Sequence, residues 1–331
     1  MTSASKIQVG SSYRLIIFYA DTYHHLIDIE GYVITEFDSG GAGAIKRYKF
    51  SPDGTKLIAQ SYDITDFFIM NHDGTEQTNL TNGALGNVLP GRYKFSPDGT
   101  KIYFGDAGGC YDIWTVNIDG SGTSNITNNG TSCDRYPDFS ADGQSIVFCS
   151  NPNGDNAYNG WDIFTMSIGG SNITNITNTP TTYPHEEYTL YSPAGDKIAY
   201  KVNPHLWIMN SDGSNPIQLT SSTTVTNSEI ANATFTPDGQ SLIYRSGINS
   251  AIGNDFGFGF VNADGTGETI LYKNGNDVSE FSVSADNKII FPEWDGTKNY
   301  LKIMDIDGTN VQTIYERSTC CIGEMMLQPI P

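Results

Sequence analysis

Several features that mark common enzymes and membrane proteins are missing from this sequence of 331 residues. No apolar run is long enough to span a bilayer, so membrane insertion is not expected. The first residues, MTSASKIQVGSSY, contain no apolar h-region, so they do not predict a signal peptide. There is no G-x-S-x-G elbow, no H-E-x-x-H motif, no P-loop and no dinucleotide fingerprint. These absences argue against the common hydrolases, zinc peptidases and nucleotide-binding enzymes.

Basic residues are also scarce. The chain has 18 Lys and Arg against 37 Asp and Glu, which gives a formal net charge of −19. Binding nucleic-acid phosphates requires a basic surface, so a nucleic-acid partner is not expected. Many of the acids occupy Asp-Gly turns and are structural, and the remaining surplus favours a cation-rich setting. We therefore expect an exported protein, either periplasmic or extracellular.

The five cysteines lack the C-x-x-C spacing of a zinc site. Cys110 and Cys133 fall in two connecting loops that we expect at the same end of neighbouring repeats. A disulfide between them is one prediction, and two unlinked thiols are the alternative. Cys149 ends an apolar segment and is expected to be a buried thiol.

An internal repeat is the main feature that the sequence does contain. The decapeptide RYKFSPDGTK occurs at Arg47–Lys56 and again at Arg92–Lys101. Related segments centre on Phe139, Tyr191, Phe235 and Val283, so that successive copies lie 44 to 52 positions apart. Self-similarity at this period is typical of propellers and other repeat architectures.

Each repeat unit has the same internal order. An apolar run such as LIAQ follows the SPDG-like turn, a second run ends in a turn such as FFIMNHDGT, and a short segment such as TNLT closes the unit. Runs rich in β-branched and aromatic residues between Asp-Gly turns predict four antiparallel strands, here lettered a to d. One such sheet cannot bury both of its faces, but copies arranged around an axis can.

The two ends of the chain predict one more unit. YRLIIFYA, HLIDIEG and YVITEF resemble strands b, c and d, and Leu327-Gln328-Pro329 aligns with Phe50-Ser51-Pro52 of strand a. We therefore predict an all-β, seven-bladed β-propeller of four-stranded antiparallel blades, closed by the C-terminal strand joining the N-terminal blade. KIQVG near the N-terminus is the alternative source of that strand. The predicted single domain, 1–331, comprises units at 13–38 plus 322–329, 47–83, 92–130, 135–180, 188–222, 231–275 and 277–317.

These units resemble the TolB-type β-propeller repeat, whose pattern is φ-S-P-D-G-x-x-I-φ followed by D-I-W-x-M-N-x-D-G-S. The resemblance extends from about Tyr13 to Pro329. It implies a propeller, and the family includes protein-docking domains, gating domains of serine peptidases and oligogalacturonate lyases. The TolB propeller has six blades, so a count of seven departs from it. The lyases bind a divalent metal through histidines, and here His185, His205, His24 and His25 come from different repeats without a ligand motif.

Departures from the repeat mark the expected ligand site. The b–c and d–a loops emerge on one face of a propeller, the top face, and three of these loops are enlarged: Ser150–Asp162, Ser246–Gly257 and Pro292–Tyr300. The predicted ligand-binding residues on this face are Tyr111, Tyr158, Trp161, His185 and Trp294. Exposed aromatic rings beside Asp and Asn are typical of sugar binding. The alternative, strongest for Trp161, is that the rings pack between blades.

Three arginines, Arg47, Arg92 and Arg135, precede strand a in successive repeats, and an aspartate precedes strand c in the same repeats: Asp66, Asp112 and Asp162. This joint occurrence favours structural Arg–Asp bridges. The functional interpretation is an anion-binding arc for an acidic sugar or for a partner's carboxylate.

One loop resembles a calcium-binding loop. Oxygen-bearing residues occur at its positions 1, 3, 5, 9 and 12, which are Asn151, Asn153, Asp155, Asn159 and Asp162. The loop lacks the Gly at position 6 and the Glu at position 12, and Asp162 is already explained by the repeat. Because of the spacing of these oxygen-bearing residues, Ca²⁺ is the one cofactor that the sequence suggests.

We predict a non-enzymatic binding module that holds a glycan or a protein on its top face. Two alternatives stay open, namely a structural subunit that self-assembles outside the cell and a metal-dependent enzyme similar to oligogalacturonate lyase.

Overall fold

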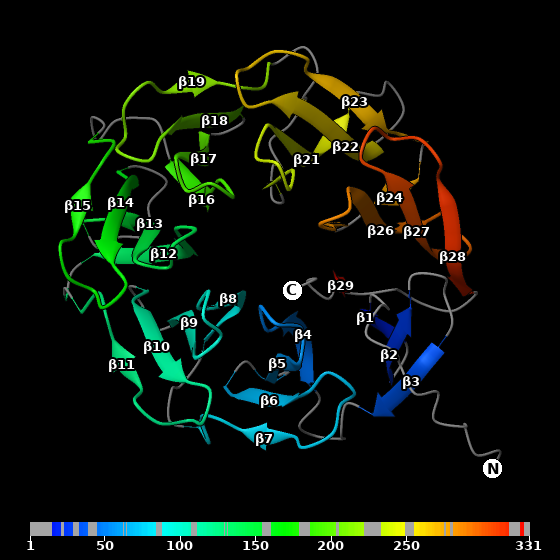
Figure 1. Ribbon diagram of the computed structural model, residues 1–331, viewed down its shortest axis with the longest axis horizontal. Helices are drawn as coiled ribbons and strands as arrows, with labels where there is room; N and C mark the ends of the chain where they lie inside the picture. The colour runs from blue at the N-terminus through cyan, green and yellow to red at the C-terminus, as the bar shows by residue number, and fades with distance from the viewer. Residues whose placement is uncertain are drawn as a thin grey trace.

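The protein is a ring of antiparallel β-sheets around a central axis (Figure 1). The computed structural model describes residues 15–20, 23–28, 33–38, 45–61, 63, 65–83, 88–106, 111–128, 130, 132–153, 160–178, 186–202, 205–221, 233–248, 255–274, 276–278, 281–317 and 325–327. In these ranges no helix has the length and apolar character needed to cross a membrane.

Six blades are each built from consecutive strands, with the first strand nearest the axis and the last at the rim (Figure 1). Blades 1 to 3 comprise β4 (Ile45–Phe50), β5 (Lys56–Ser61), β6 (Phe67–Asn71) and β7 (Thr78–Asn79); β8 (Val88–Phe95), β9 (Lys101–Asp106), β10 (Ile113–Asn117) and β11 (Ser124–Asn125); and β12 (Cys133–Phe139), β13 (Ser145–Asn151), β14 (Asp162–Ser167) and β15 (Thr174–Asn175). Blades 4 to 6 comprise β16 (Glu186–Tyr191), β17 (Lys197–Val202), β18 (His205–Asn210) and β19 (Ile217–Gln218); β20 (Ala233–Phe235), β21 (Ser241–Ile248), β22 (Asp255–Asn262) and β23 (Thr269–Tyr272); and β24 (Asp277–Val278), β25 (Ser282–Val283), β26 (Lys288–Trp294), β27 (Asn299–Asp305) and β28 (Gln312–Arg317).

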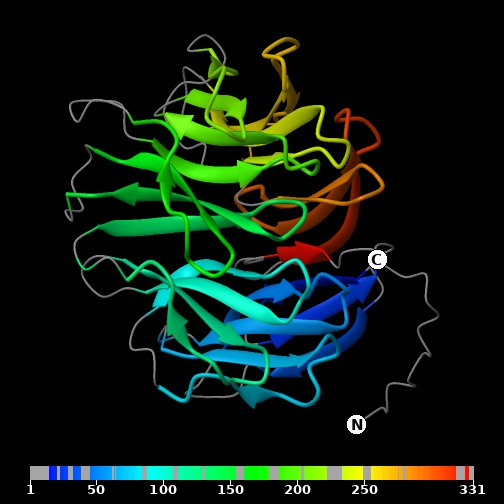
Figure 2. The ribbon, with the colours of Figure 1, turned by 60° about the vertical axis from the view of Figure 1, so that its left-hand side comes forward.

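A composite sheet uses strands from both ends of the chain. It contains β1 (Leu15–Ala20), β2 (Tyr23–Asp28), β3 (Val33–Asp38) and β29 (Met325–Leu327), in the order β29-β1-β2-β3. Ile16 pairs with Leu327 and Phe18 pairs with Met325, so the expected pairing of the C-terminal strand with the first strand is present. The blue N-terminal strands accordingly lie beside red C-terminal ones in both views (Figures 1 and 2).

The prediction of a seven-bladed propeller is wrong. The chain forms six blades from consecutive strands, and the remaining sheet is assembled from two distant segments. Blade 6 has five strands, because β24 and β25 pair separately with β26. The pairing of the two chain ends in the composite sheet was predicted, but sequence periodicity does not reveal that the inner strand of blade 6 is interrupted.

The SPDG turns are stabilised by their own side chains. Ser51 Oγ donates to Asp53 Oδ1 over 2.6 Å, and the backbone N–H of Lys56 donates to Ser51 Oγ over 2.9 Å. The bond from Ser51 and another from the Thr55 N–H hold the pKa of Asp53 below its usual value. The network recurs in other turns, and this explains why the motif itself is repeated.

Successive turns also touch one another around the ring. A Cβ placed on Gly143 would lie 3.4 Å from the side chain of Pro97 in the preceding blade. A Cβ on Gly170 would lie only 2.4 Å from the carbonyl oxygen of Ile126, and Gly170 has a φ of +85°. Only glycine accepts both restrictions without strain. The turns therefore form a repeated structural face, called the turn face below, opposite the top face.

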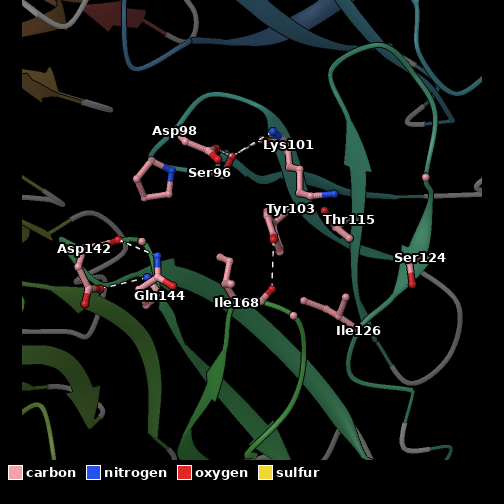
Figure 3. Close-up of a pocket in the computed structure, with 14 residues that line it drawn as sticks. Ser96, Asp98, Lys101, Tyr103, Thr115, Ser124, Ile126, Asp142, Gln144 and Ile168 are labelled. Atoms are coloured by element: carbon pink, nitrogen blue, oxygen red, sulfur yellow. Dashed lines mark hydrogen bonds between the residues drawn. The ribbon is translucent and has the colours of Figure 1, made fainter.

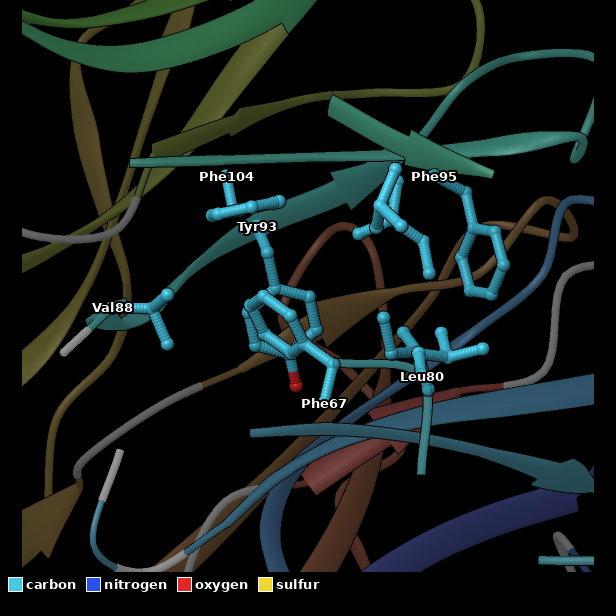
Figure 4. Close-up of a cluster of buried hydrophobic side chains, with 9 residues drawn as sticks. Phe67, Leu80, Val88, Tyr93, Phe95 and Phe104 are labelled. Atoms are coloured by element: carbon cyan, nitrogen blue, oxygen red, sulfur yellow. The ribbon is translucent and has the colours of Figure 1, made fainter. Parts of the chain in front are cut away.

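Apolar clusters between blades supply the core. Figure 4 shows the cluster between blades 1 and 2, which includes Phe67, Tyr93 and Phe104. The Phe67 ring centroid lies 4.9 Å from that of Tyr93 and 5.1 Å from that of Phe104, both in edge-to-face geometry. Each fully buried side chain of this kind contributes about 1.5–3 kcal/mol, so contacts between blades hold the ring together.

Candidate functional site

Positive charge is concentrated on the inner strands of blades 1 to 3. Six of the 18 basic residues lie there, and we call them the cation arc: Lys46, Arg47, Lys49, Arg92, Lys94 and Arg135. The inner strand of blade 4 carries Glu186 and Glu187 instead. The same three strands also carry Asp134 and Asp138, so they hold six bases and two acids. In a chain with a net charge of −19, this excess of bases near the axis is a local reversal of charge. Such a reversal favours binding of an anion.

Arg135 has the most defined environment in the arc. The carbon at the centre of its guanidinium lies 3.8 Å from the ring centroid of Trp161 and 5.0 Å from that of Tyr111. Both distances are within the range of cation–π attraction, so the two rings fix the position of the guanidinium. Trp161 is only 1% exposed and packs with Cys133 and Cys149. It thus acts as a buried platform for Arg135, in agreement with the alternative that it packs inside the propeller.

Two tyrosines beside Arg135 have unusual backbone geometry. Tyr136 and Tyr188 have φ values of 57° and 59°, in the left-handed region that bulky residues rarely adopt. Their ring centroids lie 4.5 Å apart, and Thr189 Oγ1 donates to the Tyr136 carbonyl oxygen over 2.8 Å. Strain of this kind costs about 1–3 kcal/mol per residue and gathers at functional sites.

A bulge at Tyr136 offsets the register of β12. Arg135 pairs with Cys149 and Asp138 pairs with Val147, so two residues face one. β4 has the same offset, because Lys46 pairs with Gln60 and Lys49 pairs with Ile58. Arg135 therefore occupies the register position of Lys46, one residue away from that of Arg47. The three arginines do not form a regular series, because Arg135 lies four residues before Phe139 whereas Arg47 lies three before Phe50.

Towards the turn face, the arc is linked across blades. Asp138 accepts from Lys94 Nζ over 2.6 Å and from the backbone N–H of Tyr191 over 2.7 Å, so it connects three inner strands. Burial and the Asp138 charge raise the pKa of Tyr191 to about 12. Lys49 Nζ lies 5.0 Å from the ring centroid of Tyr93. Lys94 and Lys49 therefore already contact partners within the protein. Arg135 lies at the end of the arc nearest the top face.

The other predicted ligand residues are not gathered at Arg135. Trp294 is 39% exposed at the end of β26, and blade 6 lies across the ring from blade 3 (Figure 1). Tyr158 and His185 lie outside the described residues, as do the side chains of Arg47 and Arg92 on β4 and β8. Their roles, and the Arg–Asp bridges, stay predictions.

The calcium and disulfide predictions fall partly outside the described residues. Asp155, Asn159 and Cys110 lie there, so both stay predictions. The Asn151 side chain accepts from the Asn153 N–H over 3.0 Å, and Asp162 accepts from Asn175 Nδ2 over 2.7 Å. Asp162 is thus tied to the outer strand of its own blade. Cys133 and Cys149 are buried, and the described ranges contain no group of three or more His, Cys, Asp or Glu placed to hold a metal.

A buried carboxylate in blade 6 escaped the sequence analysis. Glu293 is 2% exposed and accepts hydrogen bonds from Tyr272, Asn274 Nδ2 (2.8 Å), Asn276 Nδ2 (2.8 Å) and Lys302 Nζ (2.7 Å). Burial alone raises the pKa of Glu293, but the bonds from Lys302 and Tyr272 outweigh burial and hold it below its usual value. The one available signal was a glutamate in the apolar run KIIFPEW. We assign it the role of clamping blade 5 to blade 6.

Comparison with known proteins identifies the fold. No protein-family model matches the chain, and no curated protein matches it. Among solved structures, an oligogalacturonate lyase in complex with manganese is similar, with 16% identity and a TM-score of 0.63 over 80% of this chain and 74% of that one. Oligogalacturonate lyase from Vibrio parahaemolyticus matches at 14% identity and a TM-score of 0.66, over 92% and 86%.

TolB from Acinetobacter baumannii matches at 16% identity and a TM-score of 0.54, over 96% of this chain and 67% of that one. Together these structures support a TolB-like propeller fold. At such identities the likeness establishes the fold and leaves the activity open, so the function must be argued from this chain's own residues.

Proposed function

We propose that this protein is a non-enzymatic binding module that holds an acidic glycan on its top face, at the Arg135 end of the cation arc. The observation that carries the proposal is the concentration of six of the 18 bases on three neighbouring inner strands of a strongly acidic chain. The proposal includes export of the protein, which fractionation of producing cells would test.

The chemistry of the arc suits a carboxylate. A guanidinium forms paired, charge-assisted hydrogen bonds with a carboxylate, and these are stronger than neutral ones. Trp161 and Tyr111 restrict Arg135, so less side-chain entropy is lost when a ligand binds. Two of the structures with this fold are named oligogalacturonate lyases. We therefore choose a galacturonate oligomer as the acidic sugar for the first test.

The test is calorimetric titration of the protein with trigalacturonate and with neutral galactotriose. We expect binding of trigalacturonate that weakens with added salt, and no binding of the neutral sugar. Arg135→Gln should weaken binding about tenfold or more, which corresponds to the loss of one charge-assisted contact of about 1.5–3 kcal/mol. The matched control is Lys298→Gln, because Lys298 pairs with Glu316 at 3.2 Å outside the arc and should not affect binding.

Two results would contradict the proposal. Absence of trigalacturonate binding would remove the acidic-glycan interpretation and leave a protein partner or self-assembly. Accumulation of an unsaturated, ultraviolet-absorbing product during the titration would identify a lyase instead of a binding module.

A further inference from the structure

A cavity of about 430 Å³ opens on the turn face between blades 2 and 3 (Figure 3). It lies between strands β9 to β11 and the turn that follows β14, at the opposite end of the blades from Arg135. Its volume is within the range of small-molecule sites. The proposed function makes no use of it.

Among the six blades, the cavity adjoins the c–d turn that breaks the repeat. In the other five blades this turn carries an aspartate whose side chain accepts from the backbone N–H two residues later: Asp73, Asp119, Asp212, Asp264 and Asp307. Blade 3 has Gly169 at that position. A Cβ on Gly169 would meet nothing within 4 Å, and its φ lies outside the left-handed region. The backbone therefore does not require glycine there, and its presence leaves the space open.

One wall of the cavity presents hydrogen-bond donors. Thr115 is 6% exposed and lies beside the Tyr103 hydroxyl, and among the described residues its own hydroxyl makes no hydrogen bond of standard geometry. Leaving a buried hydroxyl unsatisfied costs about 1–3 kcal/mol, and blades 1 and 4 avoid this with Ile69 and Ile208 at the same register position. The Lys101 side chain extends towards Thr115 in Figure 3, and its ammonium has one acceptor, Asn117 Oδ1 at 2.6 Å. Ser124 lies on the same side.

The other wall presents acceptors. Asp98 Oδ1 accepts from Ser96 Oγ over 2.5 Å, and Asp142 Oδ1 accepts from the Gln144 N–H over 3.0 Å. Within the described part of the chain, neither Oδ2 atom accepts a hydrogen bond from the protein. These turn contacts hold the pKa of both aspartates below the usual value, so both carboxylates are ionised near neutral pH.

Apolar side chains line one edge of the cavity beside the two polar walls. Ile126 and Ile168 lie along that edge in Figure 3. Pro97, which precedes Asp98 in the sequence, also lines the cavity. The cavity thus combines donors, carboxylates and an aliphatic edge.

We propose that this cavity binds a small zwitterion of the α-amino-acid class. The ligand's carboxylate would accept from Lys101, Thr115 and Ser124, and its ammonium would donate to Asp98. Its aliphatic side chain would pack on Ile126 and Ile168. This is a second site, independent of the acidic-glycan site.

The test is calorimetric titration of the full chain with L-leucine and two matched analogues. 3-Methylbutylamine lacks the carboxylate, and 4-methylpentanoate lacks the ammonium. We expect L-leucine to bind about tenfold or more tightly than either analogue, because each analogue leaves one charged wall without its partner. Glucose serves as a neutral polyol and should not bind.

Variants locate the site. Thr115→Val removes only the buried hydroxyl and should weaken leucine binding by about fivefold or more. Thr165→Val makes the same change at the same register position of blade 3, outside the cavity lining, and should leave binding unchanged. Gly169→Leu should fill the space and abolish binding while the melting temperature holds. No binding of leucine, equal binding of the analogues, an unchanged affinity in Thr115→Val or binding of glucose in place of leucine would each overturn the proposal.

Discussion

Side-chain contacts repeat between blades on the turn face of this propeller, whereas they differ between blades on its top face. On the turn face equivalent side chains make equivalent contacts in five of the six blades, as the Ser51–Asp53 and Ser96–Asp98 pairs illustrate. In blade 4, Ala194 replaces the turn aspartate and Ser192 bonds Asp196 instead. On the top face the blades differ, with Arg135 stacked on Trp161 in blade 3 and the Glu293 cluster in blade 6. The repeated contacts form the scaffold, so residues that depart from them are free for ligand chemistry. Gly169 is such a departure on the turn face itself.

The largest expected effect comes from opening the ring, which should disrupt both faces together. Truncation after Cys321 removes β29, which pairs with β1, and exposes the edge of the composite sheet. We expect the melting temperature to fall by about 10 °C or more, as for a loss of several kcal/mol. A chain lacking only the last two residues is the control, and an unchanged melting curve after the longer truncation would refute ring closure by β29.

Next in size is the loss of the Glu293 carboxylate. Glu293→Ala leaves the partly buried Lys302 ammonium and the Tyr272 hydroxyl without their carboxylate acceptor, and we expect about 3–5 kcal/mol of destabilisation. Urea denaturation measures it. Glu293→Gln should cost less, because the amide oxygen still accepts. Equal stability of Glu293→Ala and wild type would mean that these blades are held by other contacts.

Three glycine substitutions, two of them in one turn, give a sharper comparison. Gly170→Ala should destabilise by about 2–4 kcal/mol, because it combines a positive φ with a contact to the Ile126 carbonyl oxygen. Gly83→Ala, which has a φ of +71° and open space, should cost about 1 kcal/mol. Gly169→Ala should be neutral or stabilise by about 0.4–1 kcal/mol. Equal effects at Gly169 and Gly170 would contradict the structural distinction between them.

The smallest expected effect is the acid response of the turn face. Hydrogen bonds hold the pKa values of its aspartates below the usual 3.8, among them Asp53, Asp98, Asp142 and Asp238. Each contributes stability that is fully present above its unfolded pKa and is lost as the pH falls through its lowered folded pKa. The urea midpoint should therefore decline below about pH 4. Asp238→Asn removes one titrating group and should flatten the decline slightly, and identical pH profiles would argue against this linkage.

The sequence was a good guide to contacts that repeat and a poor guide to those that do not. The SPDG spacing predicted the strands, and the match of Leu327 to Phe50 predicted the pairing of β29 with β1. The different register of Arg135 could have been predicted, because Arg135 lies four residues before Phe139 whereas Arg47 and Arg92 lie three before Phe50 and Phe95. The positive φ at Tyr136 has no such signature in the sequence.

The Glu293 cluster was missed for another reason. Its partners Tyr272 and Lys302 come from two neighbouring blades and become close only when the sheets pack together. The role of Trp161 was left open, because an aromatic residue before a strand can be either a buried platform or an exposed ring. Only the burial of its side chain in the structure distinguishes the two.

The central claim is that an acidic glycan docks at the top end of the cation arc and leaves the turn face unaffected. Hydrogen–deuterium exchange with and without trigalacturonate tests it most directly, because it reports each segment separately. Slowed exchange is predicted in β12 around Arg135 and in the top halves of β4 and β8, with no change in the SPDG turns. Protection confined to the turns, or no protection at ligand concentrations that saturate binding, would contradict the claim.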